Sequence, residues 1–363
     1  MILPFNTGFQ LFAQRALGEW PAGAARLLMM PDVMHHHLTD SASGEFTEAT
    51  TTQLVNARTR TWEPAIFDAL ELELEIMPEL VSPGTRLGPL RPALARKLAL
   101  PDLQVVAPAT HDTASAVAGT PLEPGWLFLS SGTWSLLGRE TPTPVIGDAA
   151  FAHDFTNEGG AGGRNRFLKN VMGLWLLEAC RGEWAAAGAD LDYAELAVRI
   201  EAAPPFRALV HPDDFRFLNP ASMTGALAGF LEETGQPAVE EPGAIARMIL
   251  ESLALRYASI VKRIVEVTGE PVRGIHVVGG GSRNAFLNQA TADAANLPVR
   301  AGPAEATALG NLLVQAIADG RFADLDDARN HLREHTSIRE FAPRPSAAWV
   351  EAGARYRELE DRA

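Results

Sequence analysis

Apolar residues recur at helical spacing in two stretches of the chain. The first, from Phe9 to about Leu28, predicts an early helix, and Met29-Met30-Pro31-Asp32 ends or restarts it because proline cannot donate a helical hydrogen bond. The second predicts a long amphipathic helix over residues 243–268. A short apolar run over residues 103–107 instead predicts a buried strand.

Strands and glycine-rich turns alternate further along the chain. Residues 126–129 and 134–137 flank the small polar sequence Ser130-Ser131-Gly132-Thr133, which is typical of a hairpin. A strand at 275–278 runs into the turn Gly279-Gly280-Gly281. A β-α-β-α run is completed by a helix over about 283–295, a strand near Val299 and a helix over about 305–318.

Two polar stretches near the start are expected to be structural. Residues 47–54 are rich in hydroxyl groups and short of helix formers, which predicts a loop with a short strand or cap. His35, His36 and His37 are adjacent, and neighbouring side chains on a helix point in different directions and cannot grip one ion. We favour a partly exposed helix surface over a metal site there.

Composition narrows the class of protein. The 363 residues are enough for two domains, and 47% apolar with 21% charged residues is ordinary for a folded chain. The net charge of −14 disfavours nucleic acid and anionic membranes as partners. Cys180 is the only cysteine, so no intrachain disulfide can form, and cytoplasm is the expected location. The first ten residues lack the features of a signal peptide, and no apolar run approaches the ~18 residues that span a bilayer.

The sequence His111-Asp112-Thr113 follows the strand predicted at 103–107. An aspartate that opens a small-residue helix lies at its positive end, where N–H groups also attract phosphate. The alternative is a plain N-cap aspartate, although Ser115 stands where a capping box would have Glu or Gln. Both interpretations stay open from these residues alone.

Two glycine turns are candidates for phosphate binding. Gly132 would let the backbone approach a phosphate and Thr133 would add a donor, although a tight turn alone could require the glycine. The turn Gly279-Gly280-Gly281 resembles a dinucleotide fingerprint, but Asn284 stands where Gly or Ala belongs and no acidic residue follows near position 300. A nucleotide-binding turn of another fold fits better than a Rossmann dehydrogenase.

These sites, in this order and spacing, resemble those of the FGGY carbohydrate kinases. The matching segments are Pro4–Thr7, Leu28–Asp32, Ala49–Leu54, His111–Val117, Ser130–Ser135, Thr156–Gly160, Leu168–Trp175, Asp213–Phe217, Val278–Asn284 and Gly302–Ala306. The resemblance covers nearly the whole chain and is strongest to the members that act on L-rhamnulose.

The resemblance implies an α/β fold of two actin-like, ribonuclease H-like ATPase domains, with ATP and sugar meeting between them. It places a partial N-terminal kinase domain at residues 1–109, a C-terminal kinase domain at 110–345 and a C-terminal helix or tail at 346–363. It also implies ATP and Mg²⁺ as cofactors, and L-rhamnulose as the sugar that is converted to L-rhamnulose 1-phosphate. The alternatives are a kinase for another ketose, such as xylulose or fuculose, and a non-catalytic nucleotide-binding relic.

The resemblance also implies a role for individual residues. Asp112 would take the proton from the sugar hydroxyl. The remaining sugar-binding residues would be His111, Thr113 and Asn170, and the nucleotide-binding residues would be Gly132, Thr133, Glu178, Gly279, Gly280 and Asn284. Glu178 stands where related kinases have a glutamine, and its charge would repel an anion.

The chain departs from the family pattern at its start. Family members begin with an Asp-x-Gly phosphate loop, and no Asp-x-Gly occurs in the 363 residues. Because Pro4–Thr7 already matches an internal segment, we expect Met1 to be an internal position and the complete protein to extend upstream. A chain without the missing strands would expose sheet edge and core surface, and we expect it to be inactive or to need a complementary fragment.

Overall fold

The computed structural model describes residues 4–362 and divides into two compact units that interleave along the chain. The first unit contains the chain up to Pro121, Arg139–Leu168 and Glu305–Thr336. The second contains Leu122–Gly138, Lys169–Ala304 and the chain from Ser337 onward. This division by contacts does not test the domain boundaries expected from the sequence, which stay predictions.

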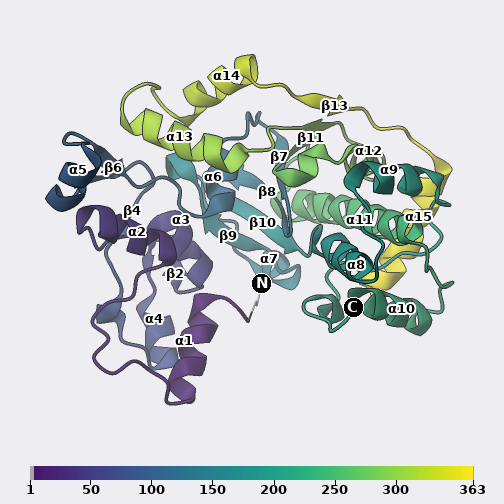
Figure 1. Cartoon of the computed structure of the whole chain (residues 1–363), viewed down its shortest axis with the longest axis horizontal. Helices are drawn as coiled ribbons and strands as arrows, with labels where there is room; N and C mark the ends of the chain where they lie inside the picture. Colours follow the sequence, from purple (N-terminus) through teal and green to yellow (C-terminus); the bar gives the residue numbers. More distant parts are fainter. Residues whose placement is uncertain (1–3, 363) are drawn as a thin grey trace. The chain divides into compact units, whose positions relative to one another are not determined.

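The first unit consists of short helices and small sheets (Figure 1). Its helices are α1 Thr7–Ala16, α2 Met30–Thr39, α3 Phe46–Ala49, α4 Pro64–Leu70, α5 Pro92–Leu98, α6 Asp112–Ala118, α7 Asp148–Ala152, α13 Ala306–Ala318 and α14 Leu325–His335, with 3-10 turns η1 Thr50–Thr52, η2 Leu74–Ile76 and η3 Ala161–Gly163. Its strands pair as β1 Gly44–Glu45 with β4 Leu80–Val81, β2 Val55–Asn56 with β3 Thr61–Trp62, β5 Arg86–Pro89 with β6 Gln104–Val106, and β9 Thr156–Gly159 with the start of β10 Asn165–Val171.

Helices α6 and α13 pack backbone against backbone because small residues, Gly119, Ala306 and Gly310, lie at the contact. A Cβ added to Gly310 in α13 would lie 1.7 Å from the carbonyl oxygen of Ser115 in α6. A Cβ added to Gly119 at the end of α6 would lie 2.2 Å from the carbonyl oxygen of Ala306. The Thr307 hydroxyl also donates a hydrogen bond to the backbone carbonyl of Asp112 at 3.3 Å. This close approach fixes the position of α6 in its unit.

A mixed parallel and antiparallel sheet forms the centre of the second unit. Strands β13 Arg339–Phe341, β12 Val299–Ala301, β11 Gly274–Val278, β7 Trp126–Ser131 and the first half of β8 Ser135–Thr141 lie side by side in that order. β11 is parallel to both β12 and β7, whereas β13 and β8 are antiparallel to their neighbours. The helices are α8 Trp175–Ala186, α9 Tyr193–Ala202, α10 Met223–Glu233, α11 Pro242–Thr268, α12 Ala285–Ala295 and α15 Ala347–Glu360, with 3-10 turns η4 Phe215–Phe217 and η5 Gly280–Arg283.

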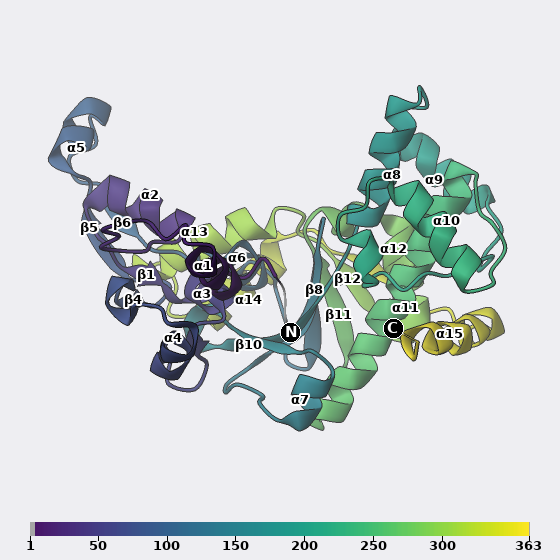
Figure 2. The same ribbon diagram turned by 90° about the horizontal axis from the view of Figure 1, so that it is seen from below.

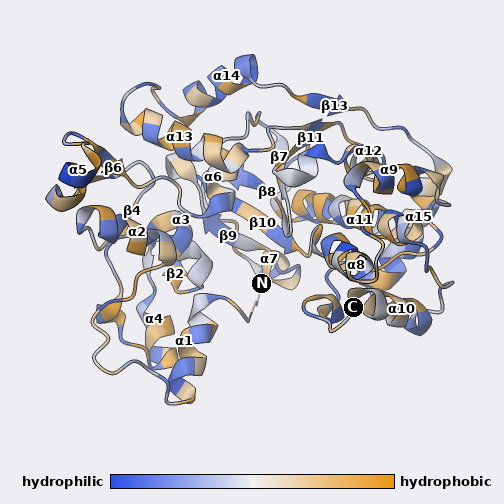
Figure 3. Ribbon diagram, in the orientation of Figure 1, coloured by the Kyte–Doolittle hydropathy of each residue, from blue (hydrophilic) through white to orange (hydrophobic). Residues whose placement is uncertain are grey.

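Helix α11 is the core element of the second unit and confirms the helix predicted over 243–268. It is largely hydrophobic in Figure 3, and α9, α12 and α15 pack along it (Figures 1 and 2). Its buried Arg256 pairs with Asp213 at 2.7 Å and with Glu360 of α15. The charge of this buried guanidinium is therefore compensated by two carboxylates.

The strands and helices predicted around the glycine turns are confirmed, but three early predictions need correction. The first helix ends at Ala16 rather than near residue 28, because Gly18 adopts a left-handed conformation with φ 71° and Pro21 follows. The restart at Met30–Thr39, with proline in the first turn, is confirmed. The strand predicted at 103–107 exists as β6, but it is not buried throughout, since Leu103 is 45% exposed.

Residues 47–54 are the third correction, since they form the helical turns α3 and η1 rather than a loop. The hydroxyls of Thr50, Thr51 and Thr52 each donate to the carbonyl three residues earlier, at 2.8, 2.8 and 2.6 Å. The hydroxyl groups therefore bond within the helical turns that they were expected to interrupt.

The contact between α6 and α13 predicts a large effect of one methyl group. Gly310→Ala has no room beside the Ser115 carbonyl, and we expect it to lower the free energy of unfolding by about 1–3 kcal/mol. Gly229→Ala in α10 is the matched control, because nothing lies within 4 Å of the added Cβ. Denaturant unfolding followed by circular dichroism measures both, and equal stability of the two variants would contradict the packing described.

Candidate functional site

Asp112 is the first residue of α6, and His111 occupies the N-cap position before it. The Asp112 side chain is 80% exposed and accepts a hydrogen bond from the Thr113 hydroxyl at 3.3 Å. The N-cap alternative for Asp112 is wrong, since the cap residue is His111. The carboxylate is accessible and lies at the positive end of the helix, so it can accept a proton from a bound hydroxyl.

His111 links Asp112 to a buried ion pair on β9 and β10. Its Nε2 lies 3.5 Å from Asp112 Oδ1, and its Nδ1 lies 2.9 Å from Nη2 of Arg166. Arg166 is fully buried and forms an ion pair with Glu158 at 3.1 Å. Burial would raise the pKa of Glu158, but the charge of Arg166 and the nearby His111 lower it below its usual range. Glu158 therefore stays ionised beside the histidine.

The segment before α6 is held by the buried carboxylate of Glu45. This carboxylate accepts from the backbone N–H groups of Thr47, Glu48 and Thr110 at 2.9, 3.2 and 3.0 Å, and from the hydroxyls of Thr47 and Thr110. The Thr47 hydroxyl in turn accepts from the backbone N–H of His111 at 3.2 Å. The start of α6 is thus fixed by hydrogen bonds to one buried carboxyl group.

A second carboxylate, Glu48, lies in the electrostatic environment of His111 and Asp112. Burial raises the pKa of Glu48; His111 opposes the rise, while Asp32, Glu45 and Asp112 add to it. Two carboxylates of different burial near one site are a common feature of proton-transfer chemistry, so Glu48 belongs to the electrostatics of the Asp112 site.

The hairpin tip of the second unit is tied to the start of α8. The carbonyl of Gly132 accepts from the N–H of Leu174 at 3.0 Å, and that of Thr133 accepts from the N–H of Trp175 at 3.1 Å. A Cβ at Gly173 would lie 2.9 Å from the Gly132 carbonyl oxygen, which explains the glycine at that position. The Thr133 side chain itself is exposed and available to a ligand.

The turn after β11 packs directly on this hairpin. Gly279 has φ 81°, and a Cβ there would lie 2.8 Å from the carbonyl oxygen of Ser131. A Cβ at Gly281 would lie 2.0 Å from the Ser131 hydroxyl oxygen, whereas Gly280 is exposed with nothing within 4 Å. The structure therefore brings the two glycine turns together and leaves the middle glycine open, as a phosphate cradle requires.

The remaining predicted nucleotide residues have defined partners. Asn284 is the N-cap of α12, and its side-chain oxygen accepts from the N–H of Leu287 at 3.0 Å. Glu178 in α8 pairs with Arg181 at 2.9 Å and accepts from the Tyr193 hydroxyl at 2.9 Å. The charge of Glu178 is thereby partly offset, and its contact with a nucleotide stays a prediction. Asn170 is half-buried near the end of β10.

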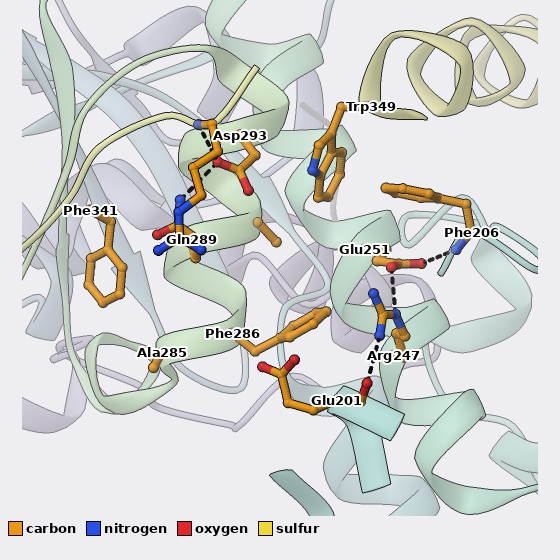
Figure 4. Close-up of a pocket in the computed structure, with 12 residues that line it drawn as sticks. Glu201, Phe206, Arg247, Glu251, Ala285, Phe286, Gln289, Asp293, Phe341 and Trp349 are labelled. Atoms are coloured by element: carbon orange, nitrogen blue, oxygen red, sulfur yellow. Dashed lines mark hydrogen bonds and ion pairs between the residues drawn. The ribbon is translucent and has the colours of Figure 1, made fainter. Parts of the chain in front are cut away.

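A pocket of about 410 Å³ in the second unit lies beyond the start of α12 (Figure 4). Arg247 lies over the ring of Phe286 at 5.3 Å and pairs with Glu251 at 2.8 Å. Glu251 also accepts from the backbone N–H of Phe206 at 2.8 Å. Because these groups satisfy one another, the pocket is part of the packing around α11 and is not a candidate catalytic site.

Within residues 4–362, no helix is long and apolar enough to cross a bilayer. The same residues contain no group of three His, Cys, Asp or Glu side chains that could hold a metal ion.

Comparison with known proteins identifies the family. Residues 13–119 match the N-terminal domain of the FGGY family of carbohydrate kinases, and residues 127–318 match its C-terminal domain. The chain is 43% identical over 350 residues to a rhamnulokinase of Bacteroides thetaiotaomicron, covering 96% of this chain and 71% of that protein. The chain belongs to the FGGY family of carbohydrate kinases. A rhamnulokinase of Enterococcus faecalis is 45% identical over 332 residues, 90% of this chain and 66% of that protein.

Solved structures of FGGY kinases and related enzymes share the fold. A xylulose kinase of Lactobacillus acidophilus matches with a TM-score of 0.76 at 16% identity, covering 98% of this chain and 70% of that chain. A gluconate kinase of the same organism matches with a TM-score of 0.77 at 17% identity, with the same two coverages. The predicted α/β fold with actin-like domains is confirmed.

Three residues of this FGGY kinase site were missed by the sequence analysis: Glu45, Glu158 and Arg166. Glu158 and Arg166 are direct partners across β9 and β10, and they flank a glycine-rich turn in the sequence. A charged pair placed symmetrically about such a turn is a signal that could have found them. Glu45 contacts Thr110 across 65 residues, and no local pattern predicts such a contact.

The contact between the two glycine turns predicts a difference between neighbouring glycines. Gly281→Ala would clash with the Ser131 side chain, so we expect its unfolding free energy to fall by about 1–3 kcal/mol. Gly280→Ala meets nothing and should unfold at the native temperature. Calorimetry of the two variants tests this, and a stable Gly281→Ala protein would show that the turns do not pack as described.

Proposed function

We propose that this protein is an ATP-dependent kinase that phosphorylates L-rhamnulose at its primary hydroxyl to give L-rhamnulose 1-phosphate. The observation that carries the proposal is the likeness to rhamnulokinases, at 43% identity over 96% of the chain for the relative from Bacteroides thetaiotaomicron. Cytoplasm is the proposed location, supported by the single, buried thiol of Cys180.

Asp112 is the proposed catalytic base. It accepts the proton of the sugar hydroxyl as that oxygen attacks the γ-phosphorus, and the bond from phosphorus to the β-phosphate oxygen breaks to release ADP. Phosphoryl transfer depends more on positioning and on stabilised phosphate oxygens than on a strong base, so an accessible carboxylate suffices. The 80% exposure of the Asp112 side chain supports this role.

The other roles are proposals of the same kind. We assign His111, Thr113 and Asn170 to the sugar. The nucleotide would be bound by Gly132, Thr133, Glu178, Gly279, Gly280 and Asn284. The open backbone of Gly280 and the exposed Thr133 side chain support phosphate binding at these turns.

Mg²⁺ is proposed to enter with the nucleotide. Mg²⁺ in kinases is held largely by phosphate oxygens and water, with few protein carboxylates, and it neutralises the charge that develops on the phosphates. The open glycine turns fit a metal that is carried by ATP, and residues 4–362 contain no three-ligand cluster that would bind one without it.

Removal of the proposed base gives a direct prediction. Asp112→Asn keeps the size of the side chain but cannot accept the proton, so we expect kcat to fall by about 10²- to 10⁴-fold with sugar binding largely kept. Asp102→Asn, at an exposed position of the same unit, is the control and should behave as the native protein. A coupled ADP assay measures both in a protein that carries the upstream segment expected from the sequence, and near-normal turnover by Asp112→Asn would remove it from the mechanism.

The sugar is tested by a panel of ketoses. With ATP and Mg²⁺, we expect kcat/KM for L-rhamnulose to exceed that for xylulose, fuculose and ribulose by about tenfold or more, because sites that hydrogen-bond a sugar reject analogues with misplaced hydroxyls. Preference for another ketose would change the substrate but keep the chemistry. Binding of ATP without turnover of any ketose, by a protein that carries the upstream segment expected from the sequence, would instead favour a non-catalytic relic.

A further inference from the structure

We infer that Arg166 fixes His111 in one neutral tautomer, with the proton on Nε2, and so presents an N–H donor beside Asp112. The inference rests on contacts within the first unit. Only its kinetic consequence depends on the proposed function.

The decisive contact is the 2.9 Å distance between Nη2 of Arg166 and Nδ1 of His111. A guanidinium has donors and no acceptor, so a hydrogen bond at this distance requires the lone pair of the imidazole nitrogen. Nδ1 therefore accepts, and the proton of the neutral ring resides on Nε2. Nε2 is the atom that faces Asp112 Oδ1, at 3.5 Å.

Arg166 is held rigidly enough to impose this choice. It is fully buried in β10, where its direct cross-strand partner in β9 is Glu158. Its Nε donates to the carbonyl of Gly159 at 2.8 Å, and its Nη2 lies 3.1 Å from Glu158 Oε2. A planar guanidinium fixed at two points cannot turn away from the histidine without breaking a buried ion pair.

The competing tautomer would place the proton on Nδ1 and donate it to Glu158. That contact is longer, at 3.4 Å, and Glu158 is already neutralised by Arg166. A proton on Nδ1 would also point at the N–H group of Arg166 only 2.9 Å away, which is repulsive. The Asp112 carboxylate, 3.5 Å from Nε2, attracts an N–H on that side of the ring, and Glu48 is a further acidic group that interacts electrostatically with His111.

The consequence of this tautomer is an N–H donor on His111 next to the Asp112 carboxylate. Nε2–H can donate to the Asp112 carboxylate or to a sugar oxygen bound next to it. The opposite tautomer would turn a lone pair toward the carboxylate and could donate to neither. Arg166 is therefore a positioning residue that acts through His111.

The tautomer can be measured by NMR with ¹⁵N-labelled histidine, since protonated and unprotonated ring nitrogens have widely separated shifts. His111→Gln assigns the signals among the nine histidines of the chain. We expect the native protein to carry the proton on Nε2. Arg166→Met should move it to Nδ1, where Glu158 accepts it, and Arg166→Lys should keep it on Nε2 because lysine also donates.

Arg329→Met is the matched control. Arg329 is a second buried arginine of the same unit, which pairs with Glu140 at 2.7 Å and donates to the carbonyl of Val117 in α6 at 2.6 Å. Its loss also removes a buried cation beside α6, but it should leave the tautomer of His111 unchanged. The same change in both variants would assign the effect to general loss of packing and overturn the inference.

The remaining outcomes are equally decisive. A native His111 with its proton on Nδ1, or an Arg166→Met protein that keeps it on Nε2, overturns the inference. If Arg166→Met does not fold, the native and Arg166→Lys spectra decide.

Kinetics add a separate test. We expect Arg166→Met to lower kcat by about tenfold or more, and Arg166→Lys to restore most of it. Loss of kcat in both variants despite a native tautomer in Arg166→Lys would contradict the positioning role. If a protein that carries the expected upstream segment phosphorylates no ketose, the proposed function fails, while the spectra still decide the tautomer.

Discussion

The candidate site of the first unit depends on the burial of one acidic side chain, that of Glu45. A charge removed from water is costly unless donors surround it, and here the donors are the backbone and hydroxyl groups of Thr47 and Thr110 together with the N–H of Glu48. Satisfying this one charge fixes two segments that are 65 residues apart. The place of the His111 backbone, and with it the start of α6, follows from that constraint.

A different constraint, close approach of backbones, shapes the rest of the machinery. α6 lies against α13 because Gly310 has no side chain, and the two turns of the second unit meet because Gly279 and Gly281 have none. In each case glycine lacks the Cβ that would keep the two backbone segments apart. The site residues of the first unit are thus positioned by satisfied polar groups and by one missing side chain, and the turns of the second unit by missing side chains.

The sequence was sufficient for elements whose pattern is local and long. The apolar stripe of α11 and the glycine turns after β7 and β11 were predicted correctly, because both depend on residues only a few positions apart in the sequence. Prediction from the sequence was wrong at residues 47–54, where threonine hydroxyls bond within helical turns. It also missed the pair of Arg166 and Glu158, because only the pairing of β9 with β10 brings these residues together beside His111. The motif of Asp112 was found by resemblance, but the reason for its orientation lies in contacts that no local pattern encodes.

The central claim, that Asp112 accepts the proton of the sugar, is tested most directly by a crystal structure with L-rhamnulose and a non-hydrolysable ATP analogue. The account predicts that the primary hydroxyl oxygen lies within about 3 Å of an Asp112 carboxylate oxygen, the reach required of a general base. A well-ordered sugar whose primary hydroxyl contacts another residue, with Asp112 left in solvent, would contradict it.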